Sequence, residues 1–459
     1  MKAVSLSAAS LAIPSCTLDS KEPMTASKAS KKPNIVFILI DDMGWSDLNC
    51  YYNRFHETPN IDRLAREGMR FTDAYAACPV CSPTRASILA GQYPARVGIT
   101  DFIPGHQRPW AKLNVPENRL QLPLESVTIA EALKEHGYST ACIGKWHLGG
   151  KPYFPQHQGF DTVVQKGLNR NDKHVTSFTD SAIDFIQANA DKPFFLYLPH
   201  HTVHIPLEAP QQLIEKYENK PTWATGVNNP IYAAMVEHLD KSIGRIIKKL
   251  DELNLTDRTI VVFFSDNGGL NQAYGGYRGK RAIVTTNAPL RSEKGTLYEG
   301  GIREPLIIRW PEVVEPGTTC SVPVSSVDFY PTFLEIIGAT GTPNHVLDGE
   351  SILPLLKQTG TLKRDAIYWH YPHYHHSTPA GAIRQGFWKL LEFYEDGRLE
   401  LYNLKNDITE KHNLATKMLQ QAAQLQQKLS AWRKSVGARM PTPNPNFDPA
   451  RAHEWGRRQ

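Results

Sequence analysis

Three short, continuous runs of apolar residues stand out along the chain, at 34–40, 193–198 and 259–264. None of them alternates polar and apolar positions, as a strand with one face in water would. A continuous run of this length predicts a strand that is buried on both faces, which is typical of a parallel sheet. The sequence therefore predicts an α/β fold built on these strands.

Apolar residues recur at helical spacing in the segments between these runs. The spacing is present at 61–68 and 127–136, and it extends furthest at 232–250. The apolar positions of this longest segment are Met235, Leu239, Ile243 and Ile247. Such stripes predict amphipathic helices, and strands that alternate with helices favour a sheet covered by helices.

The pattern changes after about residue 340. The segments 383–393 and 399–404 are strand-like, and they flank a hairpin signal at Glu395-Asp396-Gly397. Apolar residues at helical spacing predict a helix at 415–435 that packs on this sheet. We therefore expect a main domain at 33–340 and a smaller α+β subdomain at 341–440. The Pro- and Asn-rich tail at 441–459 is expected to be extended over the surface or disordered.

The N-terminal residues differ in composition from the rest. Residues 1–16 contain Lys2, a weakly apolar Ser-rich stretch and Cys16, and they are a candidate secretory signal. Cys16 is also a candidate lipid anchor, although Pro14 fits a lipoprotein signal poorly, and an uncleaved disordered leader is the alternative. Residues 17–32 have the composition of a flexible linker. We expect an exported protein, either periplasmic or secreted.

Composition and charge exclude two classes of protein. The chain has 459 residues, of which 41% are hydrophobic, and its formal charge is +5. Lys and Arg are spread along the chain, so no nucleic-acid-binding stripe is expected. No apolar stretch approaches the roughly 18 to 20 residues that span a bilayer.

Each predicted strand ends in polar residues. Asp41-Asp42 follow the first, His200-His201 and then His204 follow the second, and Asp266-Asn267 follow the third. A single such residue is often a turn residue, but ligands of open α/β sheets bind at the carboxyl ends of the strands. The three ends together predict an active-site rim. Its oxygen donors Asp41, Asp42, Asp266 and Asn267 suit Ca²⁺ or Mg²⁺ better than zinc.

A second candidate site is the run Cys81-Ser82-Pro83-Thr84-Arg85, followed by a segment that predicts a short helix. Cys81 is also the second cysteine of a C-x-x-C with Cys78, the spacing of redox dithiols and half zinc sites. The other cysteines are scattered and supply no second pair of zinc ligands. A thiol at a helix N-terminus has a lowered pKa, and Arg85, one turn on, is expected to reach back to it.

The Cys81 run resembles the modification site of the type I, formylglycine-dependent sulfatases, a family of the alkaline phosphatase-like superfamily. Further family segments follow in order, and the resemblance covers nearly the whole folded chain. They are Ile40 to Gly44, Gly144 to Gly149, Pro199 to Leu207, Phe264 to Gly269 and Leu290 to Pro305. The resemblance implies a large mixed, mostly parallel sheet between helices, with a smaller C-terminal α+β subdomain.

The resemblance also implies a set of site residues. A formylglycine-generating enzyme would oxidise Cys81 to formylglycine, whose hydrate is the nucleophile. Calcium would be held by Asp41, Asp42, Asp266, Asn267 and the modified Cys81. The catalytic donors and acids or bases would be Arg85, Lys145, His147, His204 and Lys294. We hypothesise that His204 protonates the leaving alcohol with help from Lys294, and that His147 assists the release of sulfate.

The substrate implied by the resemblance is a sulfated polysaccharide, as for exported bacterial sulfatases acting on galactans, ulvans or glycosaminoglycans. Candidate sugar-binding residues are Trp110, Trp223, His373, Tyr374, His375 and His376. Two alternatives remain open. One is a phosphonate or phosphate monoester hydrolase of the same superfold, and the other is a non-catalytic protein that binds sulfated glycans.

Overall fold

The computed structural model describes residues 32–167, 171–275, 281–341 and 344–456. The candidate signal and lipid anchor, and all of the linker except Lys32, lie outside the described residues. Residues 32–459 form one compact unit. Among the described helices, none combines the length and the apolar character needed to cross a membrane.

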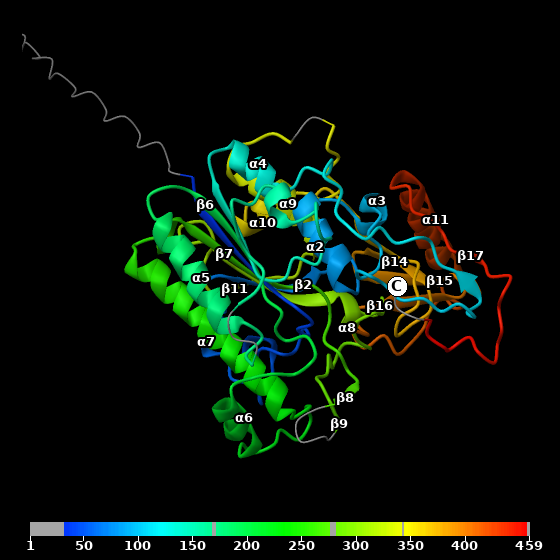
Figure 1. Ribbon diagram of the computed structural model, residues 1–459. Coiled ribbons are helices and arrows are strands. Elements are labelled where there is room, and N and C mark those ends of the chain that lie inside the picture. The colour runs from blue at the N-terminus through cyan, green and yellow to red at the C-terminus, as the bar shows by residue number, and fades with distance from the viewer. Residues whose placement is uncertain (1–31, 168–170, 276–280, 342–343, 457–459) are drawn as a thin grey trace, which may run out of the picture. The chain divides into compact units, whose positions relative to one another are not determined.

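A mixed, mostly parallel sheet of nine strands forms the centre of the fold, as expected (Figure 1). β1 (Asn34–Ile40) lies between the parallel strands β6 (Phe194–Pro199) and β7 (Thr259–Ser265). The parallel side continues with β4 (Ser139–Ile143) and β5 (Thr162–Val164). These strands confirm the predicted parallel core of the sheet.

The other side of the sheet contains strands that the sequence pattern did not predict. β10 (Arg303–Arg309) runs antiparallel to β7 and to β2 (Met69–Tyr75). β11 (Thr318–Cys320) and β12 (Val324–Ser325) pair with β2 in parallel. β10 contains Pro305 at an irregularity of its ladder with β2. Proline has no N–H to donate to a strand ladder, so a proline within an apolar run argues against a strand in a sequence-based prediction.

Helices cover both faces of the sheet (Figure 1). β1 contributes side chains to the apolar core on each face. Ile35, Phe37 and Leu39 pack with α2 (Cys81–Ala90), α4 (Ile129–Glu135) and α9 (Phe329–Ile336). Val36, Ile38 and Ile40 pack with α1 (Pro59–Glu67), α5 (Val175–Ala188) and α7 (Pro230–Glu252). Successive side chains of a strand point to opposite faces, which explains the unbroken apolar run. The predicted helices at 61–68, 127–136 and 232–250 correspond to α1, α4 and α7.

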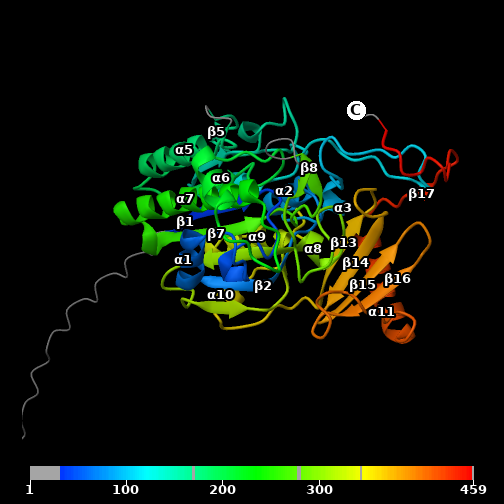
Figure 2. The ribbon, with the colours of Figure 1, turned by 90° about the horizontal axis from the view of Figure 1, so that it is seen from below.

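A separate antiparallel sheet forms the C-terminal part, seen beside α11 in Figure 2. Its strands in order are β13 (Ala366–Tyr371), β14 (Ala380–Gln385), β15 (Trp388–Phe393) and β16 (Leu399–Asn403). The helix α11 (Leu419–Ser435) packs on this sheet through Leu425 and Leu429. The predicted hairpin and helix are confirmed. The predicted strand 383–393 is two strands, because the chain turns at Gly386, where φ is +56°.

The tail is extended and ordered as far as it is described. β17 (Thr442–Pro443) pairs antiparallel with β3 (Leu113–Asn114). Short elements complete the fold: α3 (Pro94–Val97), α6 (Gln211–Glu218), β8 (Ala273–Gly275), β9 (Arg281–Ile283), α8 (Glu299–Ile302) and α10 (Leu353–Leu356). The domain boundary at about 340 stays a prediction.

A buried ionic network joins the C-terminal sheet to the main sheet. Lys389 of β15 is completely buried, and its Nζ lies 2.8 Å from Glu299 Oε1 and 2.9 Å from Glu410 Oε1. Arg384 of β14 pairs with Asp73 of β2 at 2.6 Å. Charges buried in this way are stable only while each has its partner.

We predict that Lys389→Met lowers the stability of the protein by about 3–5 kcal/mol, because it leaves buried Glu410 without its cation and removes one of the two cations paired with Glu299, which keeps Arg303. The melting temperature, measured by calorimetry or circular dichroism, should fall by several degrees. Lys405→Met is the control, because Lys405 is exposed. Equal melting temperatures for the two variants would contradict the prediction.

Candidate active site

The polar ends of β1 and β7 lie side by side because the two strands pair in parallel, with Ile40 opposite Ser265. The backbone N–H of Asp42 donates to Asp266 Oδ1 at 3.3 Å. Asn267 Nδ2 donates to Asp42 Oδ1 at 2.8 Å. The four predicted oxygen donors are therefore brought together at the carboxyl edge of the sheet.

One group of side chains here has the spacing of metal ligands. Ligand atoms of Asp41, Asp42 and His204 lie within 4.8 Å of one another. Asp41 Oδ1 and Asn267 Oδ1 are buried, and neither has a hydrogen-bond partner among the described residues. Leaving a buried polar atom unsatisfied costs about 1–3 kcal/mol. A cation with a preference for oxygen would satisfy both atoms, so these residues fit a bound metal ion.

Each carboxylate of the site faces a cation from another segment. Lys145 Nζ lies 2.5 Å from Asp41 Oδ2, and Lys294 Nζ lies 2.6 Å from Asp42 Oδ1. Arg85 donates to Asp266 Oδ2 from both Nε and Nη2, at 2.9 and 2.7 Å. Burial opposes ionisation of Asp41, but Lys145 and the other nearby cations outweigh it and lower the pKa of Asp41 well below its usual value.

Cys81 is the first residue of α2 and is 2% exposed. No side chain caps this end of the helix, so its N–H groups and the helix dipole favour negative charge at Cys81. Within the described part of the chain, Arg85 makes no hydrogen bond to Cys81, although the two groups interact electrostatically. Among the described residues, its guanidinium binds Asp266 and, at 2.7 Å, the carbonyl oxygen of Lys145. Arg85 therefore holds the strand end and the Lys145 loop together.

His147 faces Cys81 in a defined tautomer. Cys81 Sγ lies 3.4 Å from His147 Nδ1, and His147 Nε2 lies 2.6 Å from the carbonyl oxygen of Ile103. A carbonyl oxygen only accepts, so Nε2 carries the hydrogen and Nδ1 presents its lone pair to Cys81. Burial, and next the charge of Lys145, lower the pKa of His147 to about 3. The imidazole is therefore neutral, and the lone pair of Nδ1 faces the group at Cys81.

His204 is oriented in a similar way at the other side of the site. Its Nδ1 lies 2.5 Å from the carbonyl oxygen of Ile205, to which it donates, and its Nε2 lies 3.6 Å from Asp42 Oδ2. The side chain is 32% exposed. Nε2 is therefore the nitrogen available for exchange of a proton with a bound molecule.

The C-x-x-C interpretation of Cys78 and Cys81 is not supported. Every cysteine that the structure describes is a free thiol. Cys78 Sγ donates to the carbonyl oxygen of Thr100 at 3.9 Å. Within the described ranges, the one group with metal-ligand spacing contains no cysteine. The geometry thus provides neither a disulfide nor a zinc site at this position.

Two residues that shape the site were missed by the sequence analysis. Asp47 accepts hydrogen bonds from Gly44 N at 2.7 Å, Tyr232 Oη at 2.5 Å and Thr285 Oγ1 at 2.6 Å, and so anchors the loop after β1. Asn287 Nδ2 donates to the carbonyl oxygens of Gly269 and Ser292, which ties the loop after β7 to the segment with Lys294. The available sequence signal for Asp47 was its position, because it is a further acidic residue shortly after Asp42.

The predicted sugar-binding residues do not form one group. His375 and His376 line a hollow beside the site, where His376 Nδ1 lies 2.8 Å from the carbonyl oxygen of Lys294. His373 is buried and lines another cavity. Tyr374 Oη donates to Glu395. Trp223 lines a different hollow with Trp45 and Tyr52, and Trp110 stacks under Arg451 at 3.8 Å.

Comparison with known proteins relates this geometry to one family. A family model described as sulfatase matches residues 33–339, and one described as N-sulphoglucosamine sulphohydrolase, C-terminal, matches residues 292–435. A sulfatase of Formosa agariphila is 32% identical, over 89% of this chain and 90% of that protein. Human arylsulfatase A is also 32% identical, over 80% of this chain and 76% of that protein.

Solved structures agree with these relatives. Ps i-CgsB in complex with k-i-k-neocarrahexaose is 28% identical with a TM-score of 0.76, and the similarity covers 91% of this chain and 95% of that one. A phosphonate monoester hydrolase of Agrobacterium radiobacter has a TM-score of 0.67 at 18% identity, over 88% of this chain and 96% of that one. The latter likeness shows the shared fold alone.

We predict that Gly144→Ala disrupts the loop that carries Lys145 and His147. Gly144 has a φ of +133°, and a Cβ there would lie 1.9 Å from the carbonyl oxygen of Pro199. The strained backbone costs about 1–3 kcal/mol and the overlap adds a similar amount, so the melting temperature should fall by several degrees. Gly150→Ala is the control, because a Cβ there meets nothing within 4 Å. A Gly144→Ala protein as stable as this control would refute the prediction.

Proposed function

This chain belongs to the sulfatase family and is a sulfuric ester hydrolase, and we propose that its substrate is a sulfated polysaccharide or oligosaccharide. The observation that carries the proposed chemistry is the placement of Cys81, 3.4 Å from the neutral imidazole of His147 and at the start of a helix. The glycan substrate is supported by the similarity to Ps i-CgsB, whose structure contains a carrageenan oligosaccharide. We also propose an exported location, in the periplasm or outside the cell, because residues 1–16 have the composition of a candidate secretory signal.

We propose that Cys81 is converted to formylglycine by a formylglycine-generating enzyme. The aldehyde hydrate supplies a nucleophilic hydroxyl and a second hydroxyl whose deprotonation expels sulfate. His147 Nδ1 is placed to accept a proton from this side chain, because its other nitrogen is fixed on Ile103. His204 Nε2 faces the site and is the candidate acid for the leaving oxygen, with Lys294 beside the same carboxylate.

We propose that Asp41, Asp42, Asp266 and Asn267 hold a calcium ion, which would supply positive charge to grip and polarise a sulfate group. Asp41, Asp42 and Asp266 each face a cation in this site. A divalent cation would therefore leave an excess positive charge, which complements an anionic ester and its transition state. Lys145 and Lys294 lie at the same place and are suited to donate to sulfate oxygens.

The two alternatives have less support. A phosphonate monoester hydrolase resembles this chain in fold, but the described residues contain one candidate metal cluster, which suits a singly charged sulfate ester. A non-catalytic glycan-binding protein would be expected to have lost catalytic positions, whereas Cys81, His147, His204 and both lysines are present. Rates on 4-nitrophenyl sulfate and 4-nitrophenyl phosphate separate these possibilities, and we expect the sulfate to react faster.

We predict that Cys81→Ser lowers the hydrolysis of 4-nitrophenyl sulfate by at least about a thousandfold, because serine has no second hydroxyl to expel sulfate. The intact mass of the active protein should be below that of the encoded sequence, as expected when a thiol becomes an aldehyde. Cys320→Ser is the control and should keep both activity and the altered mass. Undiminished turnover by Cys81→Ser would disprove the proposed nucleophile.

We predict that calcium raises the melting temperature and that chelation lowers both the melting temperature and the activity. Asn267→Ala should shift the calcium midpoint of this thermal effect about tenfold upward, because it removes a buried oxygen donor. Asn271→Ala is the control, since Asn271 is exposed four residues further on. Calcium midpoints that coincide in the two variants would count against the proposed ligand set.

A further inference from the structure

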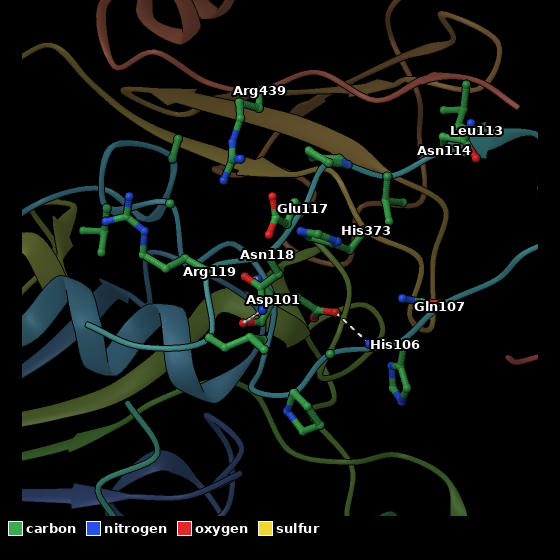
Figure 3. A pocket seen from close by; sticks show the side chains of 18 of the residues that line it. Asp101, His106, Gln107, Leu113, Asn114, Glu117, Asn118, Arg119, His373 and Arg439 are labelled. Carbon is green, nitrogen blue, oxygen red and sulfur yellow. Dashed lines mark hydrogen bonds between the residues drawn. The ribbon is translucent and has the colours of Figure 1, made fainter. Parts of the chain in front are cut away.

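A cavity of about 1100 Å³ lies between the loop 95–121 and the C-terminal residues 436–439 (Figure 3). The proposed reaction does not use it. Sites for small molecules in proteins typically measure about 300–1,000 Å³. The cavity therefore has room for several linked sugar units rather than for one small group.

Two arginines converge on this cavity from different parts of the chain. A Cβ placed on Gly98 would lie 3.6 Å from Arg439 Nη2 and 3.7 Å from Arg119 Nε. Within the part of the chain that the structure describes, neither guanidinium has an ion-pair partner. Figure 3 shows both side chains at the cavity. Both side chains are exposed, and two cations close together without an ion-paired carboxylate favour the binding of an anion.

The other charges that line the cavity leave this positive excess in place. Arg96 is paired with Asp348 at 2.7 Å. Asp101 is fully buried and accepts hydrogen bonds from Phe102 N at 3.0 Å, His106 N at 3.2 Å and Tyr371 Oη at 2.9 Å. Burial raises the pKa of Asp101 to about 7. Glu117 therefore remains as the one exposed carboxylate of the lining, against Arg108, Arg119 and Arg439.

One loop separates the cavity from the catalytic centre. On its inner side, the carbonyl oxygen of Ile103 accepts from His147 Nε2 at 2.6 Å, and Ile103 N donates to Ser82 Oγ at 3.1 Å. On its outer side, Pro104, Gly105 and His106 line the cavity. The hydrogen bonds to Asp101 fix this loop, so the cavity and Cys81 are held on its two sides.

A smaller hollow of about 430 Å³ leads from the cavity toward the catalytic centre and shares His106 and Arg108 with it. It is also lined by Trp455, by His376, whose Nδ1 lies near the carbonyl oxygen of Lys294, and by Glu293, whose carboxylate lies 3.8 Å from the His376 ring. Trp455 is 45% exposed, and Arg108 Cζ lies 3.9 Å from the centre of its ring. The His106 ring also packs against it, with 4.6 Å between the ring centres, so the exposed part of the indole forms an apolar wall of the hollow.

The tail and the segment just before it contribute residues to both the cavity and the hollow. The tail is fixed to the loop 107–114 by the β17–β3 pairing, by Asn444 Nδ2 donating to the carbonyl oxygen of Ala111 at 2.7 Å, and by Gly456 N donating to that of Gln107 at 2.9 Å. The segment after α11 brings Arg439 to the cavity, and the far end of the tail brings Trp455 to the hollow. The tail thus has a role besides covering the surface.

We propose that the cavity and the hollow form an extended binding site for an acidic glycan chain. Arg119 and Arg439 bind a second anionic group, a sulfate or a carboxylate, on the same chain whose sulfate ester is held at Cys81, and Trp455 supports a sugar between them. This rests on the proposed function and narrows it: the preferred substrate is a polyanionic oligosaccharide, not a small sulfate ester.

The experiment uses a Cys81→Ala protein, so that binding is measured without turnover. Isothermal titration calorimetry compares three hexasaccharides: sulfated ι-neocarrahexaose, carboxylated oligogalacturonate and neutral neoagarohexaose. Each hexasaccharide is titrated into three proteins. The first carries Cys81→Ala alone, the second also carries Arg119→Gln and Arg439→Gln, and the third carries Cys81→Ala with Arg245→Gln. Arg245 is exposed on α7 and lines neither the cavity nor the hollow, so it is the matched control.

We expect an anionic hexasaccharide to bind, and the two arginine substitutions to weaken it about tenfold, with a smaller difference at high salt. If the affinity for the sulfated hexasaccharide falls in the arginine variant, the bound anion is a sulfate. If the affinity for the carboxylated one falls, it is a carboxylate. In the Cys81 protein, the two substitutions should leave the rate on 4-nitrophenyl sulfate unchanged. Trp455→Ala, at an exposed position, should weaken the same hexasaccharide without affecting the melting temperature.

Three results would overturn the inference: binding of neither anionic hexasaccharide, equal binding of the neutral one, or an affinity unaffected by the arginine substitutions. All three leave the proposed function intact if the wild-type protein hydrolyses 4-nitrophenyl sulfate. Conversely, arginine-dependent binding in a protein that releases no sulfate would support the glycan site and refute the proposed activity.

Discussion

The structure depends above all on the neutralisation of three carboxylates that the fold brings to one edge of its sheet. Burying a charge without its partner costs several kcal/mol, so this edge is stable only when cations reach it. Each cation comes from a separate segment: Arg85 from α2, Lys145 from the loop after β4, and Lys294 from the loop before α8. The requirement for charge balance therefore brings these segments together, and a divalent cation at the proposed metal site would shift that balance toward positive charge.

Packing on both sides of β1 holds that edge in position, and the C-terminal part is attached to it by charge as well as by apolar contacts. Lys389 and Arg384 of the small sheet pair with carboxylates of α8 and β2. This attachment places His376 against the backbone of Lys294 and lets the tail reach the loop beside His147. The C-terminal sheet is thus part of the surroundings of the catalytic centre and not an independent appendage.

The elements that the sequence predicted correctly are those whose pattern is local. β1, β6 and β7 are apolar throughout because both of their faces are buried, and α7 has its apolar stripe because one face is buried. β10 was missed because Pro305 interrupts its pattern, and 383–393 was predicted as one strand because a turn at Gly386 needs no polar cluster. Asp47 and Asn287 were missed because their roles consist of hydrogen bonds to distant segments.

The sequence by itself determined the α/β class, the polar strand ends and the identity of the chemical groups, because buried strands and family segments are written in consecutive residues. Tertiary structure decided how those groups are used. It turned Arg85 toward Asp266 instead of Cys81, fixed the tautomer of His147 through Ile103, and brought Arg119 and Arg439 together across a cavity. These relations join residues far apart in the chain, and their energies depend on distance and burial, which a linear pattern does not contain.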